Sequence, residues 1–552
     1  MAVAPATVSS SAHDREDVHI DIDDLELKAQ GYDRAMPRRF NLLSLISMSY
    51  ALLATWNGFG SAFGTGFTEA SSAGSIWTLT IAALMTAVTG IGMAELASAY
   101  PVAGAQYYWS YVVATPEWGP FASYISAGIS TLGWWLGLAS VTNFIASMIT
   151  GIAVLNHPDY VIERWHIWLI FVAITWSAIA MNVFGTRWLP LWNKFILFFS
   201  ATTLIVTMIT ILACAAPKFQ SAKFVFSDTT NSTGWPNDGL AFLLCLVNAL
   251  YGFLGVDCGS HLCEEIPRPT VNVPKVIMYP VLMGFVTCFP YAISLSFVIT
   301  DFEKVIATPT GLPLIEVYYQ ATGSKAGTSI LMVAFAICFF GCATASVTSA
   351  SRQMWSASRD NCFPFAKYWR QIHPRWQMPV NAALLTESEL YGLIYLGSSA
   401  AFASMVGACI VFQTTSYVVP QGILAWRGRD KVLPPRALNL GKFGLPLNVL
   451  ACVWVVFIDI IYCLPVFRPV TVGKVFLLAD VVIVGLVSFL LLNWVVYQRH
   501  IFKGPNLNME LLQAARHDEL LGHRTIDGVP VGDDNGILEA LRQRSISQDK
   551  KA

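Results

Sequence analysis

The stretch TWNGFGSAFGTG, residues 55–66, lies in the first long apolar run of the chain. It places Gly58, Gly60, Gly64 and Gly66 where a membrane-spanning helix normally carries large apolar side chains. Each glycine costs a helix about 1 kcal/mol relative to alanine. Either these small residues let two helices pack closely, or the helix is unwound here and its backbone lines a cavity.

The composition is that of a membrane protein. Of the 552 residues, 55% are hydrophobic and 12% are charged, whereas soluble proteins carry about 25% charged residues. The apolar residues gather in runs of roughly 20, the length that crosses about 30 Å of hydrocarbon. The net charge of −1 says nothing about nucleic-acid binding, and no basic cluster in the sequence suggests it, so we expect no nucleic-acid partner. We therefore predict an all-α polytopic membrane protein embedded in a lipid bilayer.

Twelve candidate spans are found, at residues 41–68, 73–98, 119–151, 165–185, 191–216, 238–261, 275–300, 327–352, 379–397, 400–426, 447–467 and 475–498. An even number places both termini on one side. The connections on that side hold fourteen lysines and arginines, and those on the other side hold seven. The positive-inside rule therefore predicts that both termini are cytoplasmic.

A single N-glycosylation sequon, Asn231-Ser232-Thr233, falls in a loop that this topology places outside. Asn231 is therefore a candidate glycosylation site. The spans divide the chain into an N-terminal tail (1–40), a transport core of helices one to ten (41–426), helices eleven and twelve with their preceding loop (427–500), and a C-terminal tail (501–552). Neither tail has a sustained apolar period, so we expect both to be mobile.

The sixth span, GLAFLLCLVNALYGFLGVDCGSHLCEEIPRP (residues 239–269), is also interrupted. Gly252 and Gly255 break its pattern, and Asp257 and His261 are embedded in it. Interruptions in the first and sixth spans are typical of an inverted repeat of five plus five helices, whose broken helices meet at a substrate site near the middle of the membrane. We therefore favour the cavity-lining interpretation of the opening stretch.

Asp257 has three possible roles. An acid in a spanning helix costs about 2.5–3.5 kcal/mol on insertion scales, so it normally faces the protein interior or a cavity. It could attract a cationic substrate, carry a proton, or brace the broken helix through hydrogen bonds. These alternatives stay open at the level of the sequence.

Three motifs are similar to those of a known superfamily: MAELASAYPVAGAQYYW (93–109), LGVDCGSHLCEEIPRPTVNVPKVI (254–277) and SASRQMWSASRDNCFP (349–364). Over about residues 35–500 the chain resembles the amino acid–polyamine–organocation superfamily, and within it the fungal amino acid/choline permeases. The resemblance implies a leucine-transporter-like fold of twelve helices, the 5+5 inverted repeat followed by two C-terminal helices. It also implies import of a small zwitterion or organic cation at the plasma membrane, usually by proton symport. A vacuolar or other internal membrane is the alternative location.

By position, the resemblance assigns substrate-binding residues in the unwound first helix, namely Trp56, Asn57, Gly58, Phe59, Gly60 and Ser61. Those of the unwound sixth helix are Tyr251, Gly252, Phe253 and Asp257. The resemblance also implies an inner gate containing Glu95, Arg352 and Arg359, and Glu264 at the cytoplasmic end of the sixth span is a candidate gate-pairing residue.

The substrate stays open between choline, 4-aminobutyrate and another amino acid. A quaternary ammonium is held by cation–π contact with aromatic faces, and the aromatic candidates are Trp56, Phe59, Trp134, Trp135, Tyr251, Phe253, Phe339 and Phe340. An amino acid would instead place its carboxylate on the helix-one amides of Gly58 to Ser61. The alternatives to an importer are a transporter-like nutrient sensor and an exchanger or exporter of a related amine. No nucleophile–base pair, metal cluster or nucleotide loop is apparent in the sequence, so we predict no enzyme activity, metal or cofactor.

Two features depart from the family pattern. The ninth span is short and contains Glu387 and Glu389, and Asp480 lies in the twelfth span. We interpret the acids of the ninth span as a local sequence anomaly or a gene-model error.

Overall fold

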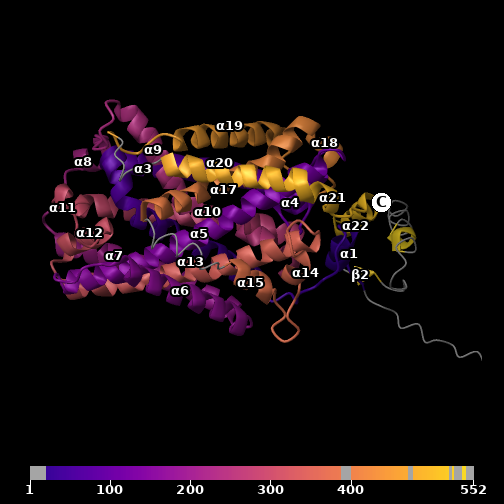
Figure 1. Ribbon diagram of the computed structural model, residues 1–552, viewed down its shortest axis with the longest axis horizontal. Coiled ribbons are helices and arrows are strands. Elements are labelled where there is room, and N and C mark those ends of the chain that lie inside the picture. Colours follow the sequence, from indigo (N-terminus) through magenta and orange to yellow (C-terminus); the bar gives the residue numbers. More distant parts are fainter. Residues whose placement is uncertain (1–19, 387–398, 470–476, 521–524, 527–536, 542–552) are drawn as a thin grey trace, which may run out of the picture. The chain divides into compact units, whose positions relative to one another are not determined.

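The computed structural model describes residues 20–386, 399–469, 477–520, 525–526 and 537–541 (Figure 1). The chain forms two compact units, one from residues 35–505 and one that combines the residues before and after that range. Glu387 and Glu389 of the predicted ninth span lie outside the described residues. The division of residues 35–505 into a core and two further helices stays a prediction.

The larger unit is helical. Its elements are α2 (Leu42–Leu53), α3 (Thr55–Ala99), α4 (Gln106–Val113), α5 (Gly119–Asn156), α6 (Arg164–Phe184), α7 (Leu189–Ala215), α8 (Ala222–Ser227), α9 (Asp238–Leu250), η1 (Tyr251–Phe253), η2 (Cys258–Glu265), α10 (Pro269–Val298), α11 (Phe302–Ile306), α12 (Pro313–Thr322), α13 (Lys325–Arg359), α14 (Ala366–Trp369), α15 (Val380–Thr386), α17 (Ser399–Arg427), α18 (Arg429–Val432), η3 (Gly441–Phe443), α19 (Gly444–Tyr462), α20 (Leu477–Asn493), η5 (Trp494–Gln498) and α21 (Arg499–Ile501). Of these, η1, η2 and η3 are 3₁₀-helices and η5 is a π-helical turn.

Ten helical segments of the described residues are long and apolar enough to cross a membrane. The longest, Leu42–Ala99, contains two spans, because the backbone leaves the helix at Ala70 and Ser71. The hydroxyl of Ser75 lies 3.5 Å from the point that a Cβ on Gly66 would occupy, whereas residues nine apart in a continuous helix are about 13.5 Å apart along the axis. The chain therefore turns back there, as predicted between the first two spans, and the all-helical polytopic fold is confirmed.

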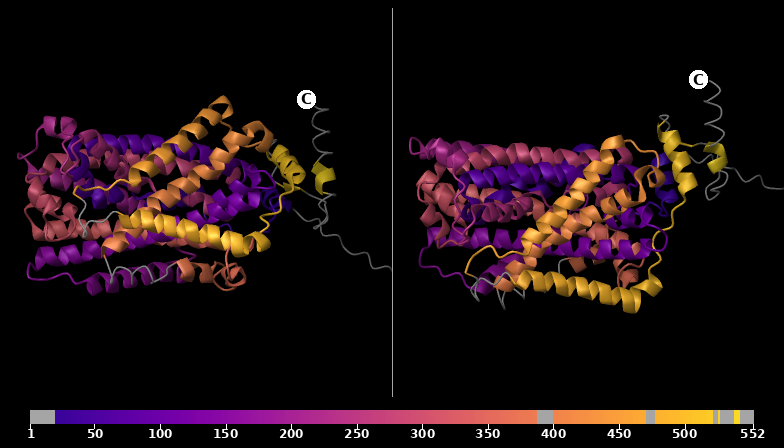
Figure 2. Two further views of the ribbon diagram at one scale, coloured as in Figure 1. Left: turned by 45° about the horizontal axis from the view of Figure 1, so that its top comes forward. Right: turned by 90° about the horizontal axis from the view of Figure 1, so that it is seen from above.

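The two broken spans lie against each other at the centre of the unit. α3 packs against α9, η1 and α10, while α5 packs against α13 and α17. α19 and α20 run along one side of this bundle (Figure 2). Their outer apolar side chains, such as Val453 and Leu492, are exposed, as is expected of helices that face lipid.

The predicted glycosylation sequon lies between α8 and α9. Asn231 is half-buried, and its amide nitrogen donates to the carbonyl oxygen of Trp235 at 3.3 Å. Its amide oxygen accepts from the Thr233 hydroxyl at 2.8 Å. Glycosylation of Asn231 stays a prediction.

The smaller unit shows that parts of the two tails are folded. The helix α1 (Ile22–Ala29) packs against α22 (Met509–Leu520), and the strand β1 (Ile20–Asp21) pairs antiparallel with β2 (Thr525–Ile526). The expectation that both tails are mobile is therefore wrong for these segments; residues 1–19, 521–524, 527–536 and 542–552 of the tails lie outside the described ones. Short amphipathic segments such as these bury apolar area only against each other, and this pairing cannot be seen in either tail alone.

A buried ionic cluster lies between α1 and α22. Nη1 of Arg516 lies 3.0 Å from Oε2 of Glu26 and 3.1 Å from Oε2 of Glu519, and both Glu26 and Arg516 are almost fully buried. Burial raises the pKa of Glu26 to about 8, although Arg516 acts in the opposite direction. The folded unit therefore binds a proton that the unfolded chain, with a glutamate pKa of about 4.3, releases.

We predict that α1 and α22 separate more readily as the pH rises. Because the pKa of Glu26 is higher in the folded state, the stability that it contributes is complete below the unfolded pKa and is lost as the pH rises towards 8. Local opening should increase by up to about tenfold per pH unit in this range. Hydrogen–deuterium exchange of the full-length protein at pH 5.5 and 8.5, corrected for intrinsic exchange, measures it. Glu26→Gln should remove the difference, and equal protection of wild-type α1 at both pH values would contradict the prediction.

Candidate functional site

The first helix break is a single residue. α2 ends at Leu53, Ala54 has the left-handed conformation (φ 41°, ψ 42°), and α3 begins at Thr55. The amide of Gly58 already donates to the carbonyl oxygen of Ala54 at 2.7 Å. Our prediction that residues 55–61 form an unwound segment is therefore wrong, because these residues are the first turns of α3.

The second break is longer and agrees with the prediction for residues 251–257. α9 ends at Leu250, η1 follows, Leu254 is extended and η2 begins at Cys258. Gly255 has a φ of 79°, and a Cβ at this position would lie 2.0 Å from Cδ2 of Leu52. Only glycine fits this backbone conformation and this contact.

Glycines let the two breaks touch. A Cβ on Gly58 would lie 2.9 Å from the Cα of Gly252, and a Cβ on Gly252 would lie 3.0 Å from the carbonyl oxygen of Thr55. Close packing, one of the two interpretations of the opening stretch, thus accounts for Gly58. The same residue also borders a cavity, so close packing and cavity lining coincide there.

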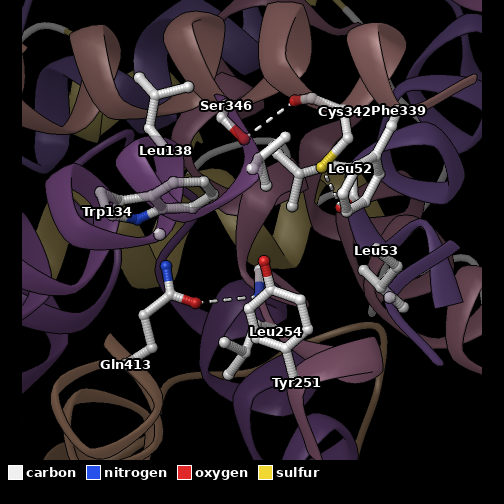
Figure 3. Close-up of a pocket in the computed structure, with 14 residues that line it drawn as sticks. Leu52, Leu53, Trp134, Leu138, Tyr251, Leu254, Phe339, Cys342, Ser346 and Gln413 are labelled. Atoms are coloured by element: carbon white, nitrogen blue, oxygen red, sulfur yellow. Dashed lines mark hydrogen bonds between the residues drawn. The ribbon is translucent and has the colours of Figure 1, made fainter. Parts of the chain in front are cut away.

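A cavity lies beside the two breaks (Figure 3). It is lined by Leu52, Leu53, Gly58, Trp134, Gly137, Leu138, Val141, Tyr251, Leu254, Gly255, Phe339, Cys342, Ser346 and Gln413. Three of these residues, Trp134, Tyr251 and Phe339, supply aromatic rings. Among the described residues that line the cavity, none is charged.

Hydrogen bonds hold several polar groups of the cavity wall, whereas the indole nitrogen of Trp134 has no partner among the described residues. The hydroxyl of Tyr251 lies 2.7 Å from Oγ of Ser140. The amide of Gly255 donates to Oε1 of Gln413 at 3.1 Å (Figure 3). The hydroxyl of Ser346 donates to the carbonyl oxygen of Cys342 at 2.9 Å. The described residues of the wall thus present aromatic rings and neutral polar groups to the cavity.

Four of the predicted residues border this cavity: Gly58, Tyr251 and the aromatic candidates Trp134 and Phe339. On α3, the indole nitrogen of Trp56 donates to Oγ of Ser200 at 2.9 Å, and the amide of Asn57 donates to the carbonyl oxygen of Phe335 at 3.4 Å. Both side chains are buried among neighbouring helices.

The remaining predicted residues have other surroundings. Gly60 faces Tyr291 and Phe335, Ser61 donates to the carbonyl oxygen of Gly58, and Gly252 packs on Thr55. Phe59 and Phe253 border two other, smaller cavities.

Asp257 lies behind the cavity and is almost fully buried. Its Oδ2 accepts from Nε2 of Gln106 at 2.6 Å and lies 3.0 Å from Nε2 of His261. Its Oδ1 accepts from the hydroxyl of Tyr417 at 3.0 Å. Tyr417 also accepts from the amide of Gly255 at 3.0 Å, which links Asp257 to the cavity wall.

The predicted gate residues form two groups of ion pairs. Arg359 donates to both carboxylate oxygens of Glu264, at 2.6 and 3.0 Å, and Nε of Arg352 donates to Glu265 at 2.9 Å. Glu95 belongs to a different cluster. It pairs with Arg436 at 2.7 Å and with Arg429.

The chain matches a known family of membrane proteins over most of its length. The model of the amino acid permease family matches residues 40–489. The chain belongs to this family, within the amino acid–polyamine–organocation superfamily. It is a permease, a membrane transporter of amino acids or organic cations rather than an enzyme.

Several characterised relatives are similar over most of their length. The permease is 33% identical to the choline transporter of Saccharomyces cerevisiae over 500 residues, which are 89% of this chain and 88% of that protein. It is 28% identical to the amino-acid permease BAT1 of Arabidopsis thaliana, covering 89% and 97% of the two chains. It is 25% identical to the 7-keto 8-aminopelargonic acid transporter of S. cerevisiae, covering 79% and 88%.

Sequence reasoning missed the partners that come from distant segments. Gln106, Gln413 and Tyr417 hold the second break in place, and Arg429 and Arg436 neutralise Glu95. Gln413 stands in the apolar run of α17, and a polar residue in a spanning helix normally faces a partner. This signal was present in the sequence, but it does not say which partner is faced.

We predict that Gly58→Ala lowers transport by about fivefold or more, because the new methyl group would overlap Gly252 and overpacking costs about 1–3 kcal/mol. The matched control is Gly485→Ala in α20, where a Cβ meets nothing within 4 Å. Uptake at equal surface expression measures the effect. Wild-type uptake in Gly58→Ala would show that the two breaks do not need this contact.

Proposed function

We propose that this permease imports a small quaternary amine of the choline class across the plasma membrane by proton symport. The observation that carries the proposal is the cavity wall, in which Trp134, Tyr251 and Phe339 surround a space without charged side chains among the described lining residues. A quaternary ammonium donates no hydrogen bond and is recognised by aromatic faces. The similarity to a choline transporter supports the same substrate class.

An amino acid fits this cavity less well. Its carboxylate would need free backbone amides or a cation, and the amide of Gly58 is already bonded within the helix. The donors left at the start of α3 are those of residues 55–57. None of these three residues is among the described residues that line the cavity. Aromatic recognition is therefore the stronger interpretation.

The ion pairs support alternating access around the two breaks. Glu264 and Glu265 at the end of η2 are held by Arg359 and Arg352 at the end of α13. The topology predicted from the positive-inside rule has this end of the bundle and both termini on the cytoplasmic side. These pairs would then form an inner gate that must separate before substrate leaves the cavity.

We predict saturable uptake of labelled choline in yeast that lacks its own permeases, greater at external pH 5 than at pH 7.5 and not reduced by amino acids.

Phe339→Leu removes one of the aromatic rings of the cavity wall and should raise the KM for choline by about 3- to 30-fold, since cation–π contacts contribute about 0.5–2 kcal/mol. The measurement is the concentration dependence of uptake.

The matched control is the neighbouring Phe340→Leu. Phe340 does not border the cavity, and its ring faces Trp192 with 6.2 Å between centroids. The KM of Phe340→Leu for choline should stay close to that of the wild type. Uptake of 4-aminobutyrate that other amino acids inhibit, with no choline uptake, would reject the quaternary-amine proposal.

We predict that Glu264→Gln loosens the inner gate. Removing one partner of a buried ion pair leaves the other charge uncompensated at a cost of about 3–5 kcal/mol. The buried thiols Cys258 and Cys263 on η2 should then react faster with N-ethylmaleimide, measured by peptide mass spectrometry. The control is Asp301→Asn, which breaks the exposed pair between Asp301 and Lys304. Unchanged thiol reactivity in Glu264→Gln would argue against a gate at this pair.

A further inference from the structure

The contacts of His261 determine how many protons it shares with Asp257. Nδ1 of His261 lies 2.9 Å from the carbonyl oxygen of Ala103, and Nε2 lies 3.0 Å from Oδ2 of Asp257. Both ring nitrogens therefore face oxygen atoms, and the two side chains are almost fully buried. A carbonyl oxygen can only accept a hydrogen bond, so Nδ1 must carry a hydrogen.

With Nδ1 protonated, the second contact also needs a proton. In one case this second proton lies on Nε2, and His261 is an imidazolium beside the carboxylate of Asp257. In the other case it lies on the carboxyl group of Asp257, which then donates a hydrogen bond to neutral His261. Without this proton, the lone pair on Nε2 of His261 would face a lone pair on Oδ2 of Asp257 across 3.0 Å. Moving the ring hydrogen from Nδ1 to Nε2 would only transfer the same repulsion to the carbonyl of Ala103, at 2.9 Å.

The other contacts of Asp257 are compatible with a bound proton. Oδ2 accepts from Gln106, and Oδ1 accepts from Tyr417. The titratable and charged groups on η2 and on the helices around it are Cys258, Cys263, Glu264 and Glu265 on η2, Tyr50 on α2, Tyr107, Tyr108 and Tyr111 on α4, Lys275, Tyr279, Cys288 and Tyr291 on α10, Lys325, Cys338, Cys342, Arg352 and Arg359 on α13, and Cys409, Tyr417 and Arg427 on α17. Arg352 and Arg359 are engaged by Glu265 and Glu264, and Arg427 donates to the carbonyl oxygen of Val113. His261 is thus the cationic partner that the geometry gives Asp257.

The pair is connected to the cavity on one side. Tyr417 binds both Asp257 and the amide of Gly255, which borders the cavity. The ring of Trp134, another cavity residue, lies edge-on to His261 with 5.7 Å between centroids. A substrate that contacts Trp134 and Gly255 would therefore be separated from the Asp257–His261 pair by a single residue.

The pair is connected to the gate on the other side. Ala103 accepts from His261 through its carbonyl oxygen, and its amide donates to Oε1 of Glu264 at 3.2 Å. Glu264 in turn binds Arg359. Loss of the proton from the pair would leave one of the two contacts of His261, with Asp257 or with Ala103 next to the gate, without a hydrogen.

We propose that the Asp257–His261 pair is the proton-binding site of this permease, and that its proton holds the inner end of the cavity closed. The inference rests on the proposed proton symport and names the groups that carry the proton. The protonated pair stabilises the closed inner end, the state in which the cavity must be loaded from outside.

The test uses the full-length protein in proteoliposomes with labelled choline. Wild type should accumulate choline when the external pH is lower than the internal pH, and choline entry should acidify the lumen. His261→Gln and Asp257→Asn should lose acidification, and their accumulation should fall to equilibrium. Exchange of external for internal choline, which needs no net proton movement, should continue and become independent of pH.

The matched control is Glu69→Gln. Glu69 is also a fully buried acid in a spanning helix, and its Oε2 has no hydrogen-bond partner among the described residues. It lies near the end of the first span, where the backbone turns at Ala70 and Ser71. Glu69→Gln should keep proton-driven accumulation. Loss of coupling in this variant, with coupling intact in His261→Gln, would overturn the inference.

The possible failures can be told apart. If wild type carries choline without acidifying the lumen, the proposed symport fails and the inference fails with it. If wild type acidifies the lumen and His261→Gln does so equally, only the inference fails. If His261→Gln and Asp257→Asn are both inactive, the inference is tested by proton uptake or release when choline binds to the detergent-solubilised wild type. Uptake or release of protons on binding, detected with a pH indicator between pH 5 and 8, supports the pair, and its absence overturns it.

Discussion

The site depends on the direct contact of two backbones. Gly58 at the start of α3 and Gly252 in η1 approach so closely that a single methyl group on either would overlap the other segment. This contact brings the first and sixth spans together where both are interrupted, and Tyr251 then reaches the cavity beside Trp134 and Phe339. The two glycines thus allow the close approach of the segments beside which the cavity lies.

The sequence predicted where the breaks meet but not how they are built. Glycines in two distant spans indicated a shared site, and the structure brings Gly58 and Gly252 together. The break itself is at Ala54, an alanine in a left-handed conformation, which an L-residue adopts at a cost of about 1–2 kcal/mol. No local signal marks such a residue, because the surrounding tertiary contacts impose its conformation.

The error at Ala54 also explains the misplaced side chains of α3. Because residues 55–61 are helical, their side chains point in directions 100° apart instead of together into one cavity. Trp56 and Asn57 accordingly bind Ser200 and the backbone at Phe335, on other helices. In the sixth span, the interruption was predicted correctly, yet Gln106 and Tyr417 were not expected to hold Asp257, since they are 151 and 160 residues away in the sequence. The folded pairing of α1 with α22 was missed for the same reason.

Of the three roles that the sequence left open for Asp257, the structure shows the bracing contacts, and the proton-binding role is the one proposed above. Through Tyr417 it braces the second break, and through His261 and Ala103 it reaches Glu264. A buried polar network is stable when every member has a partner, and it becomes costly when one contact is lost. In the proposed proton site, removal of the shared proton would leave two lone pairs facing each other, a repulsion that separation of the two side chains would relieve. A protonated and a deprotonated arrangement would then form the two-state element that coupling between a cavity and a gate requires.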